Sequence, residues 1–113
     1  MKKVSLNETE QFNNSDLCIA TEYNFADKDI DVATAVINGR YPDDGFCVNT
    51  MVKEMIFVIE GSGTIFSENE RISFQAGDAI LIEKNKKYYW DAHCKVAMSC
   101  TPAWYPEQHK FVK

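Results

Sequence analysis

Residues 47–63, CVNTMVKEMIFVIEGSG, contain one acidic side chain in a setting where its charge has chemical consequences. Glu54 opens the run EMIFVIE, which is apolar between its two glutamates, rich in β-branched and aromatic residues, and too short to cross a membrane. A carboxylate on such a strand costs free energy unless a metal ion, another cation or hydrogen-bond donors meet it. Glu54 is therefore our first candidate for ligand binding or acid/base chemistry. The alternative is that Glu54 lies in water at the mouth of the strand.

Two further predicted strands carry polar and aromatic side chains that can join Glu54. Because side chains alternate along a strand, Cys47 and Asn49 share one face of the strand predicted over 46–50. Tyr88 and Trp90 share one side of the strand predicted over 87–91. Glu54 as base and Tyr88 as acid form a candidate catalytic pair if both reach one substrate. Cys47 has no histidine near it in the sequence that would activate it as a nucleophile.

The elements that must position these residues are all strands. Turn signals recur at short intervals, and no convincing amphipathic helix separates them, which predicts a β-sandwich or barrel. In the central strand we expect Glu54, Ile56 and Val58 to face inward and the apolar set Met55, Phe57 and Ile59 to face outward. Gly61-Ser62-Gly63 predicts a tight turn that closes this strand. The predicted strands cover residues 17–25, 30–37, 46–50, 54–60, 64–67, 71–74, 79–82, 87–91 and 95–101.

The chain is expected to form one domain, residues 1–113, because 113 residues can enclose a single core. Within it we predict an N-terminal arm at 1–16, a barrel at 17–101 and a C-terminal tail at 102–113 that packs on the barrel. The tail contains prolines that lack ladder donors, so it cannot be a central strand.

Charge and cysteine usage exclude several classes of partner. The net charge of -5, with no cluster of Lys and Arg, argues against nucleic acid and against an anionic membrane surface. No apolar leader follows Met1, so we expect a cytoplasmic protein. The four cysteines form neither a CxxC pair nor a zinc-binding spacing, and we expect reduced, partly buried thiols.

The spacing of these residues resembles the two motifs of the cupin superfamily. Glu54, six residues and Gly61 match the end of the first motif, and Gly77-Asp78 matches the start of the second. Asn85 stands at a glycine position of the second motif, which asparagine tolerates because it accepts a left-handed backbone. The resemblance covers nearly the whole chain. It implies an all-β fold, the cupin double-stranded β-helix, which is a jelly-roll-like antiparallel barrel.

The resemblance also identifies the positions of the family's metal ligands, three histidines and a glutamate. In this chain only the glutamate, Glu54, remains, so the motifs are those of a small cupin with degenerate metal ligands. The two histidines, His93 and His109, fall in a predicted turn and in the tail, outside the expected ligand strands. We therefore predict no family-type metal, with an atypical divalent ion at Glu54 as an alternative. The histidine positions are occupied here by Cys47, Asn49 and Tyr88, or in a shorter spacing by Val48 and Thr50.

The first functional hypothesis is a metal-free barrel that binds a small polar molecule, because a few polar groups among apolar and aromatic walls are typical of small-molecule sites. The second is an enzyme, either a metal-dependent isomerase or dioxygenase with atypical ligands or a metal-independent sugar epimerase or lyase. The third is a non-catalytic interaction module. Under all three we expect a homodimer that covers the outward apolar set. The predicted ligand-binding residues are Cys47, Asn49, Glu54, Tyr88 and Trp90.

Overall fold

The computed structural model describes all 113 residues and consists of antiparallel strands with two short 3-10 helices. The all-β prediction is confirmed. Neither 3-10 helix has the length or apolar character of a helix that crosses a membrane. The elements are η1 (Leu6–Glu8), β1 (Glu10–Ser15), β2 (Cys18–Tyr23), β3 (Asp31–Tyr41), β4 (Phe46–Asn49), β5 (Lys53–Phe66), β6 (Arg71–Gln75), β7 (Ala79–Ile82), β8 (Lys87–Thr101), η2 (Pro106–Gln108) and β9 (His109–Val112).

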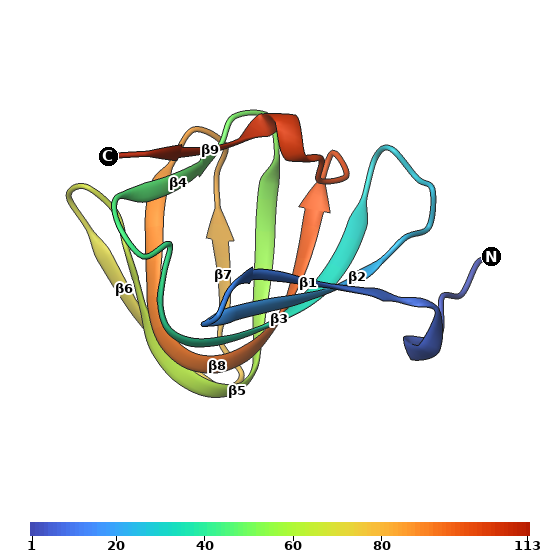
Figure 1. Ribbon diagram of the computed structural model, residues 1–113, viewed down its shortest axis with the longest axis horizontal. Helices are drawn as coiled ribbons and strands as arrows, with labels where there is room; N and C mark the ends of the chain where they lie inside the picture. The colour runs from blue at the N-terminus through green and yellow to red at the C-terminus, as the bar shows by residue number, and fades with distance from the viewer.

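Strands β5 and β8 form the spine of the sheet. They are the longest strands, 14 and 15 residues, and they pair with each other along nearly their whole length. β8 also pairs with β3 and β4, while β5 also pairs with β6 and β7. Both spine strands curve strongly, so that β4 and β9 lie at the top of the molecule in Figure 1 and β1 and β2 cross its front. The curled sheet thereby encloses an interior between these strands.

The predicted turn at Gly61 is wrong, because β5 continues through it to Phe66. The register of β5 on β8 shifts between Val58 and Glu60, which marks a β-bulge, and Gly61 follows with φ of +85°. A Cβ atom at Gly61 would lie 2.1 Å from the carbonyl oxygen of His93 on β8. The glycine therefore permits a bend and a close strand approach instead of a reversal.

Strand β8 also corrects the sequence-based prediction, because the segments 87–91 and 95–101 are one strand. His93 consequently lies within β8 and not in a turn, and its side chain is exposed. At the hairpin tip before β8, Asn85 adopts φ of +66°, as expected for a residue at a glycine position.

The alternation predicted for the central strand is present in β5. Ile56 and Val58 are fully buried and Glu54 is 6% exposed, whereas Met55 and Phe57 are both 50% exposed. The inward residues join a single core. Its larger members are Ile37, Ile56, Val58, Ile65, Phe74, Ile80, Ile82, Tyr88, Trp90 and Val96.

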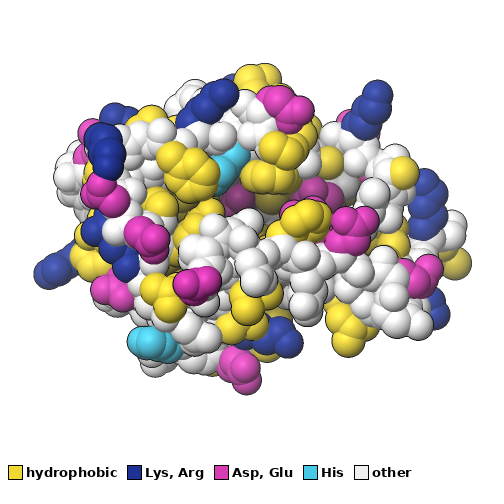
Figure 2. Space-filling view, viewed as in Figure 1, with side chains coloured by type: hydrophobic (Ala, Val, Ile, Leu, Met, Phe, Trp, Pro, Cys, Tyr) yellow, Lys and Arg dark blue, Asp and Glu magenta, His cyan; other side chains and the backbone are white.

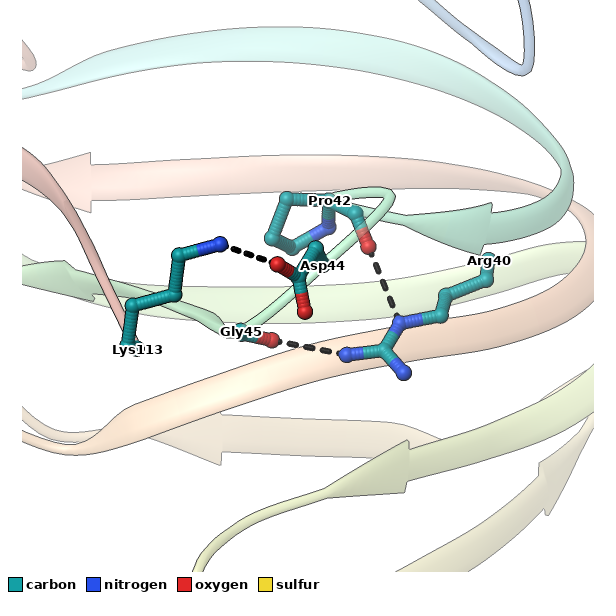
Figure 3. A network of polar contacts seen from close by, with 5 residues as sticks. All are labelled: Arg40, Pro42, Asp44, Gly45 and Lys113. Carbon is teal, nitrogen blue, oxygen red and sulfur yellow. Dashed lines mark hydrogen bonds and ion pairs between the residues drawn. The ribbon is translucent and has the colours of Figure 1, made fainter.

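Arg40 fixes the loop that leads from β3 into β4. Its Nε donates to the Pro42 carbonyl at 3.1 Å and one terminal nitrogen donates to the Gly45 carbonyl at 2.8 Å, while Asp44 pairs with Lys113 (Figure 3). The guanidinium also stacks 3.8 Å above the ring of Tyr89. These contacts place the start of β4.

Both ends of the chain enter the sheet as edge strands. β1 pairs with β2, and β9 pairs with β4, so that His109 lies opposite Asn49. His109 lies in the tail and outside the expected ligand strands, as predicted, but β9 places it directly beside Asn49. The sequence of β9 gives no alternating apolar signal, and the strand forms because β4 offers it a free edge.

Candidate functional site

A cavity of about 690 Å³ opens between the curled sheet, the β1–β2 hairpin and the C-terminal segment. Figure 2 shows the corresponding face, with a hollow that has hydrophobic and acidic side chains along its rim. Of the predicted ligand-binding residues, Glu54, Tyr88 and Trp90 line this cavity. Cys47 and Asn49 are as deeply buried as the core but lie behind the lining. That these five residues bind a ligand remains a prediction.

Glu54 lines the cavity and is among its buried residues. Its Oε1 accepts a hydrogen bond from the side-chain amide of Asn49 at 3.1 Å, and the Cys100 thiol lies against the same carboxyl. Burial raises the pKa of Glu54 to about 6, with a smaller contribution from the nearby Asp31 carboxylate. The group is therefore largely ionised at neutral pH and takes up a proton under mildly acidic conditions.

A chain of hydrogen bonds fixes how the Asn49 amide is oriented. The backbone N–H groups of Met51 and Val52 donate to Oε1 of Gln108 at 3.3 and 3.2 Å, and these groups can only donate. Nε2 of Gln108 must then face Asn49, and it donates to Oδ1 at 2.9 Å. The Nδ2 group of Asn49 is left to donate to Glu54, and more weakly to Oη of Tyr88 at 3.5 Å.

The same chain determines the tautomer of His109. Its Nδ1 lies 2.9 Å from Oδ1 of Asn49, which is an acceptor, so Nδ1 carries the proton. Burial lowers the pKa of His109, which keeps the ring neutral. Its Nε2 therefore has a free lone pair, and His109 lines the cavity. The ring is held between Trp104 and Phe111, with centroid distances of 5.7 and 5.1 Å.

The remaining predicted residues provide support more than reactivity. The Cys47 thiol donates to the Tyr88 carbonyl at 3.4 Å, and burial raises its pKa to about 12, so it remains a thiol. Burial, followed by the charge of Glu54, raises the pKa of Tyr88 well above its usual value and keeps the phenol protonated. Trp90 packs edge-on against Phe74, 5.7 Å away, and forms part of the cavity wall.

The residues at the family's metal positions do not fit a metal ion. Cys47 is a protonated thiol outside the cavity lining, and the amide of Asn49 is committed to Gln108, His109 and Glu54. No group of three or more His, Cys, Asp or Glu side chains that could hold a metal ion is present. Glu54 and His109 are too few ligands for the metals that cupin ligands usually select, because such sites need three or more protein ligands.

Sequence reasoning missed Gln108, His109 and Asp31. Gln108 is 2% exposed and lies in a polar tail segment whose burial no periodicity reveals. The alternation of side chains places Asp31 and Val32 on opposite faces of their strand. The position of Asp31 beside Cys100, however, depends on the register of β3 on β8. The single available signal was the presence of a glutamine and a histidine side by side in an aromatic tail.

No protein-family model and no curated protein sequence matches the chain. Solved structures do resemble it. The nucleoside dehydratase Pac13 of Streptomyces, solved with uridine, has a TM-score of 0.89 at 18% identity, covering 100% of this chain and 92% of that one. The polyketide cyclase RemF of Streptomyces resistomycificus has a TM-score of 0.76 at 13% identity (100% and 86% covered). An RmlC-like cupin from Shewanella frigidimarina has a TM-score of 0.68 at 13% identity, with 86% of each chain covered. The chain thus has the cupin fold, as its sequence predicted, and its neighbours differ in function.

Proposed function

We propose that the protein binds a small polar organic molecule in its cavity and does so without a cupin-type metal ion. The observation that carries this proposal is the buried Glu54 carboxyl in the lining of a cavity of about 690 Å³, with His109 and Tyr88 also in the lining. Sixteen of the 27 lining residues are hydrophobic, a balance typical of small-molecule sites. The uridine bound by Pac13, which has the same fold, also supports a small polar ligand.

The second candidate is a metal-independent acid/base enzyme of the lyase or epimerase class. It is favoured by the opposite protonation states of neighbouring groups: Glu54 is largely ionised at pH 7, whereas the phenol of Tyr88 is held in its protonated form. Glu54 can accept a proton from a bound substrate, and the protonated phenol of Tyr88 can donate a hydrogen bond to that substrate. The neutral His109, joined to Glu54 through Asn49, is a second possible base. Pac13 is described as a nucleoside dehydratase, and a dehydration is a lyase reaction.

Glu54→Gln separates the two candidates. In either case we expect small polar ligands, tested by NMR on protein treated with a chelator, to perturb the indole signals of Trp90 and Trp104. For a binding protein, the substitution should weaken the ligand about tenfold, because a charged hydrogen bond becomes a neutral one. For an enzyme, it should lower turnover about 100-fold or more. Wild-type turnover should then rise with pH through about 6, because Glu54 acts as a base only when ionised.

The two histidines provide a test and its control, because His109 lines the cavity and His93 does not. His109→Gln should reduce binding or turnover, whereas His93→Gln, an exposed position on β8, should leave both unchanged. A stoichiometric metal found by elemental analysis and lost in Glu54→Ala would contradict the metal-free proposal. Failure of every polar molecule to bind would favour the interaction module instead.

We further propose that the protein is a homodimer, formed through the outward face of β5 and β7. Met55, Phe57 and Ile59 are 44 to 50% exposed there, and Leu81 lies opposite Met55 on β7 and is also half exposed. A second copy of the chain would remove this apolar surface from water. Light scattering should give about twice 12.9 kDa, and Phe57→Lys should give monomers while Met51→Lys, in an exposed loop, should not. A 12.9 kDa wild-type species would contradict the proposal.

A further inference from the structure

We infer that the ligand of this cavity is an organic cation, a small protonated amine with a flat or apolar body. The inference rests on the proposed binding function and specifies its ligand class. It is carried by the charges of the lining, which are of one sign. The lining contains no lysine or arginine, and its acidic residues are Glu8, Glu10, Glu22, Asp27, Asp31 and Glu54.

Four of these acids follow one another across the sheet, from the exposed Glu10 to the buried Glu54. Glu10 on β1 lies directly opposite Glu22 on β2, and Asp31 on β3 is the next acid along. Cys100 on β8 lies opposite Asp31 on one side and opposite Glu54 on the other. Like charges in such positions destabilise a sheet. After burial, their mutual repulsion contributes to raising the pKa of Glu22 and of Glu54.

The protein pairs none of these acids with a lysine or arginine, and Lys2, which reaches the lining residue Phe25, donates to its carbonyl oxygen at 3.4 Å instead. The three ion pairs of the protein lie elsewhere, between Lys86 and Glu70, Lys87 and Glu68, and Lys113 and Asp44. Arg40, the arginine of β3, is turned toward the carbonyls of its own loop (Figure 3). Glu54 is thus a carboxyl more than nine-tenths buried that lines a cavity and lacks a cationic partner. A ligand with a positive charge provides that partner.

The arrangement of the carboxyls fits an organic cation better than a metal ion. The carboxyls are spread along the cavity, and no three of them are close enough to hold a metal ion. Aromatic side chains line the same cavity, among them Tyr41, Trp90 and Trp104. Their faces attract ammonium groups and pack against flat apolar bodies. For the same electrostatic reason, phosphate and carboxylate ligands are disfavoured.

The test compares molecules that share one scaffold and carry an amine, an alcohol or an acid as the terminal group, so that their charge at that end is positive, neutral or negative. One set is 5′-amino-5′-deoxyuridine, uridine and uridine-5′-carboxylate, and the other is tyramine, tyrosol and 4-hydroxyphenylacetate. Titrations followed by NMR at pH 7.5 and low salt should show at least one amine binding tenfold or more tightly than its alcohol, with the acid weakest in that set. Added salt should weaken the amine and leave the alcohol nearly unchanged.

Three neutralising variants identify the carboxyls responsible. Glu54→Gln and Asp31→Asn should each reduce the preference for the amine about tenfold, and both keep their present hydrogen bonds, from Asn49 and from the Trp104 N–H. If either of these variants fails to fold, Glu22→Gln replaces it, because Glu22 is only half buried. Glu60→Gln removes the same charge from an exposed site and should have no effect.

The outcomes separate the charge of the ligand from the existence of a site. If an alcohol or an acid binds as tightly as its amine, the inference of a cationic ligand is wrong and the proposed binding function stands. If the amine preference survives in Glu54→Gln and Asp31→Asn, the inference is also wrong. If no member of either set perturbs the cavity signals, both the inference and the proposed function are contradicted.

Discussion

Replacing Gln108 with leucine should lower the free energy of unfolding by about 3 kcal/mol and abolish ligand binding, although Gln108 is not among the cavity-lining residues. The substitution leaves the N–H groups of Met51 and Val52 without their acceptor and Oδ1 of Asn49 without one of its donors. Each unpaired buried group costs roughly 1–3 kcal/mol. The released Asn49 amide can rotate, and its hydrogen bond to Glu54 is then no longer enforced.

Gln108→Glu is the sharper variant because it keeps the hydrogen bonds from the loop N–H groups and removes only the one donated to Asn49. A carboxylate still accepts from the Met51 and Val52 N–H groups, but its second oxygen faces Oδ1 of Asn49, which is also an acceptor. The Asn49 amide should turn over and lose its hydrogen bond to Glu54. We expect a change in the Asn49 side-chain amide signals by NMR and a shifted pKa at Glu54.

Urea denaturation measures the stability of these variants, with Gln75→Leu, an exposed position on β6, as the control. If Gln108→Leu is as stable as the wild type, Gln108 does not hold the loop through the contacts described above. If Gln108→Glu leaves the pKa of Glu54 unchanged, the orientation of Asn49 does not depend on Gln108.

The part of the site that could be predicted from the sequence follows from short-range alternation. Glu54, Ile56 and Val58 face inward because a strand alternates its side chains, and this pattern is visible within seven residues. His109 and Asn49 are 60 residues apart, and their contact depends on β9 adding to the edge of β4. No local pattern encodes such a pairing, because β9 has few apolar residues and its hydrogen bonds come from the backbone.

The fold could be predicted more completely than the site because the cupin spacing constrains the order of the strands. The error at residues 61–63 has a specific physical origin. A Gly-Ser-Gly sequence is compatible with a turn, but equally with a bulge where two backbones approach closely. Local sequence cannot distinguish the two, since the approaching backbone belongs to residues 91–94 of β8. Only the tertiary pairing decides between them.

Gly61→Ala should lower the free energy of unfolding by roughly 3–4 kcal/mol, since left-handed backbone strain and a steric clash act together. The backbone of Gly61 has φ of +85°, and the added Cβ would lie 2.1 Å from the His93 carbonyl oxygen and 2.7 Å from Cα of Cys94. These are main-chain atoms of β8, so they cannot move aside without disturbing the pairing of β5 and β8.

Gly77→Ala isolates the strain from the clash. Gly77 also has a positive φ, +93°, but a Cβ atom there would meet nothing within 4 Å. Its substitution should cost only about 1–2 kcal/mol, the strain contribution alone. The difference between the two variants in the free energy of unfolding, measured by urea denaturation, therefore reports how closely the backbone of β5 approaches that of β8 after the bulge. Equal losses of stability would mean that the strands separate easily at this point, and the curvature that forms the cavity would then need another cause.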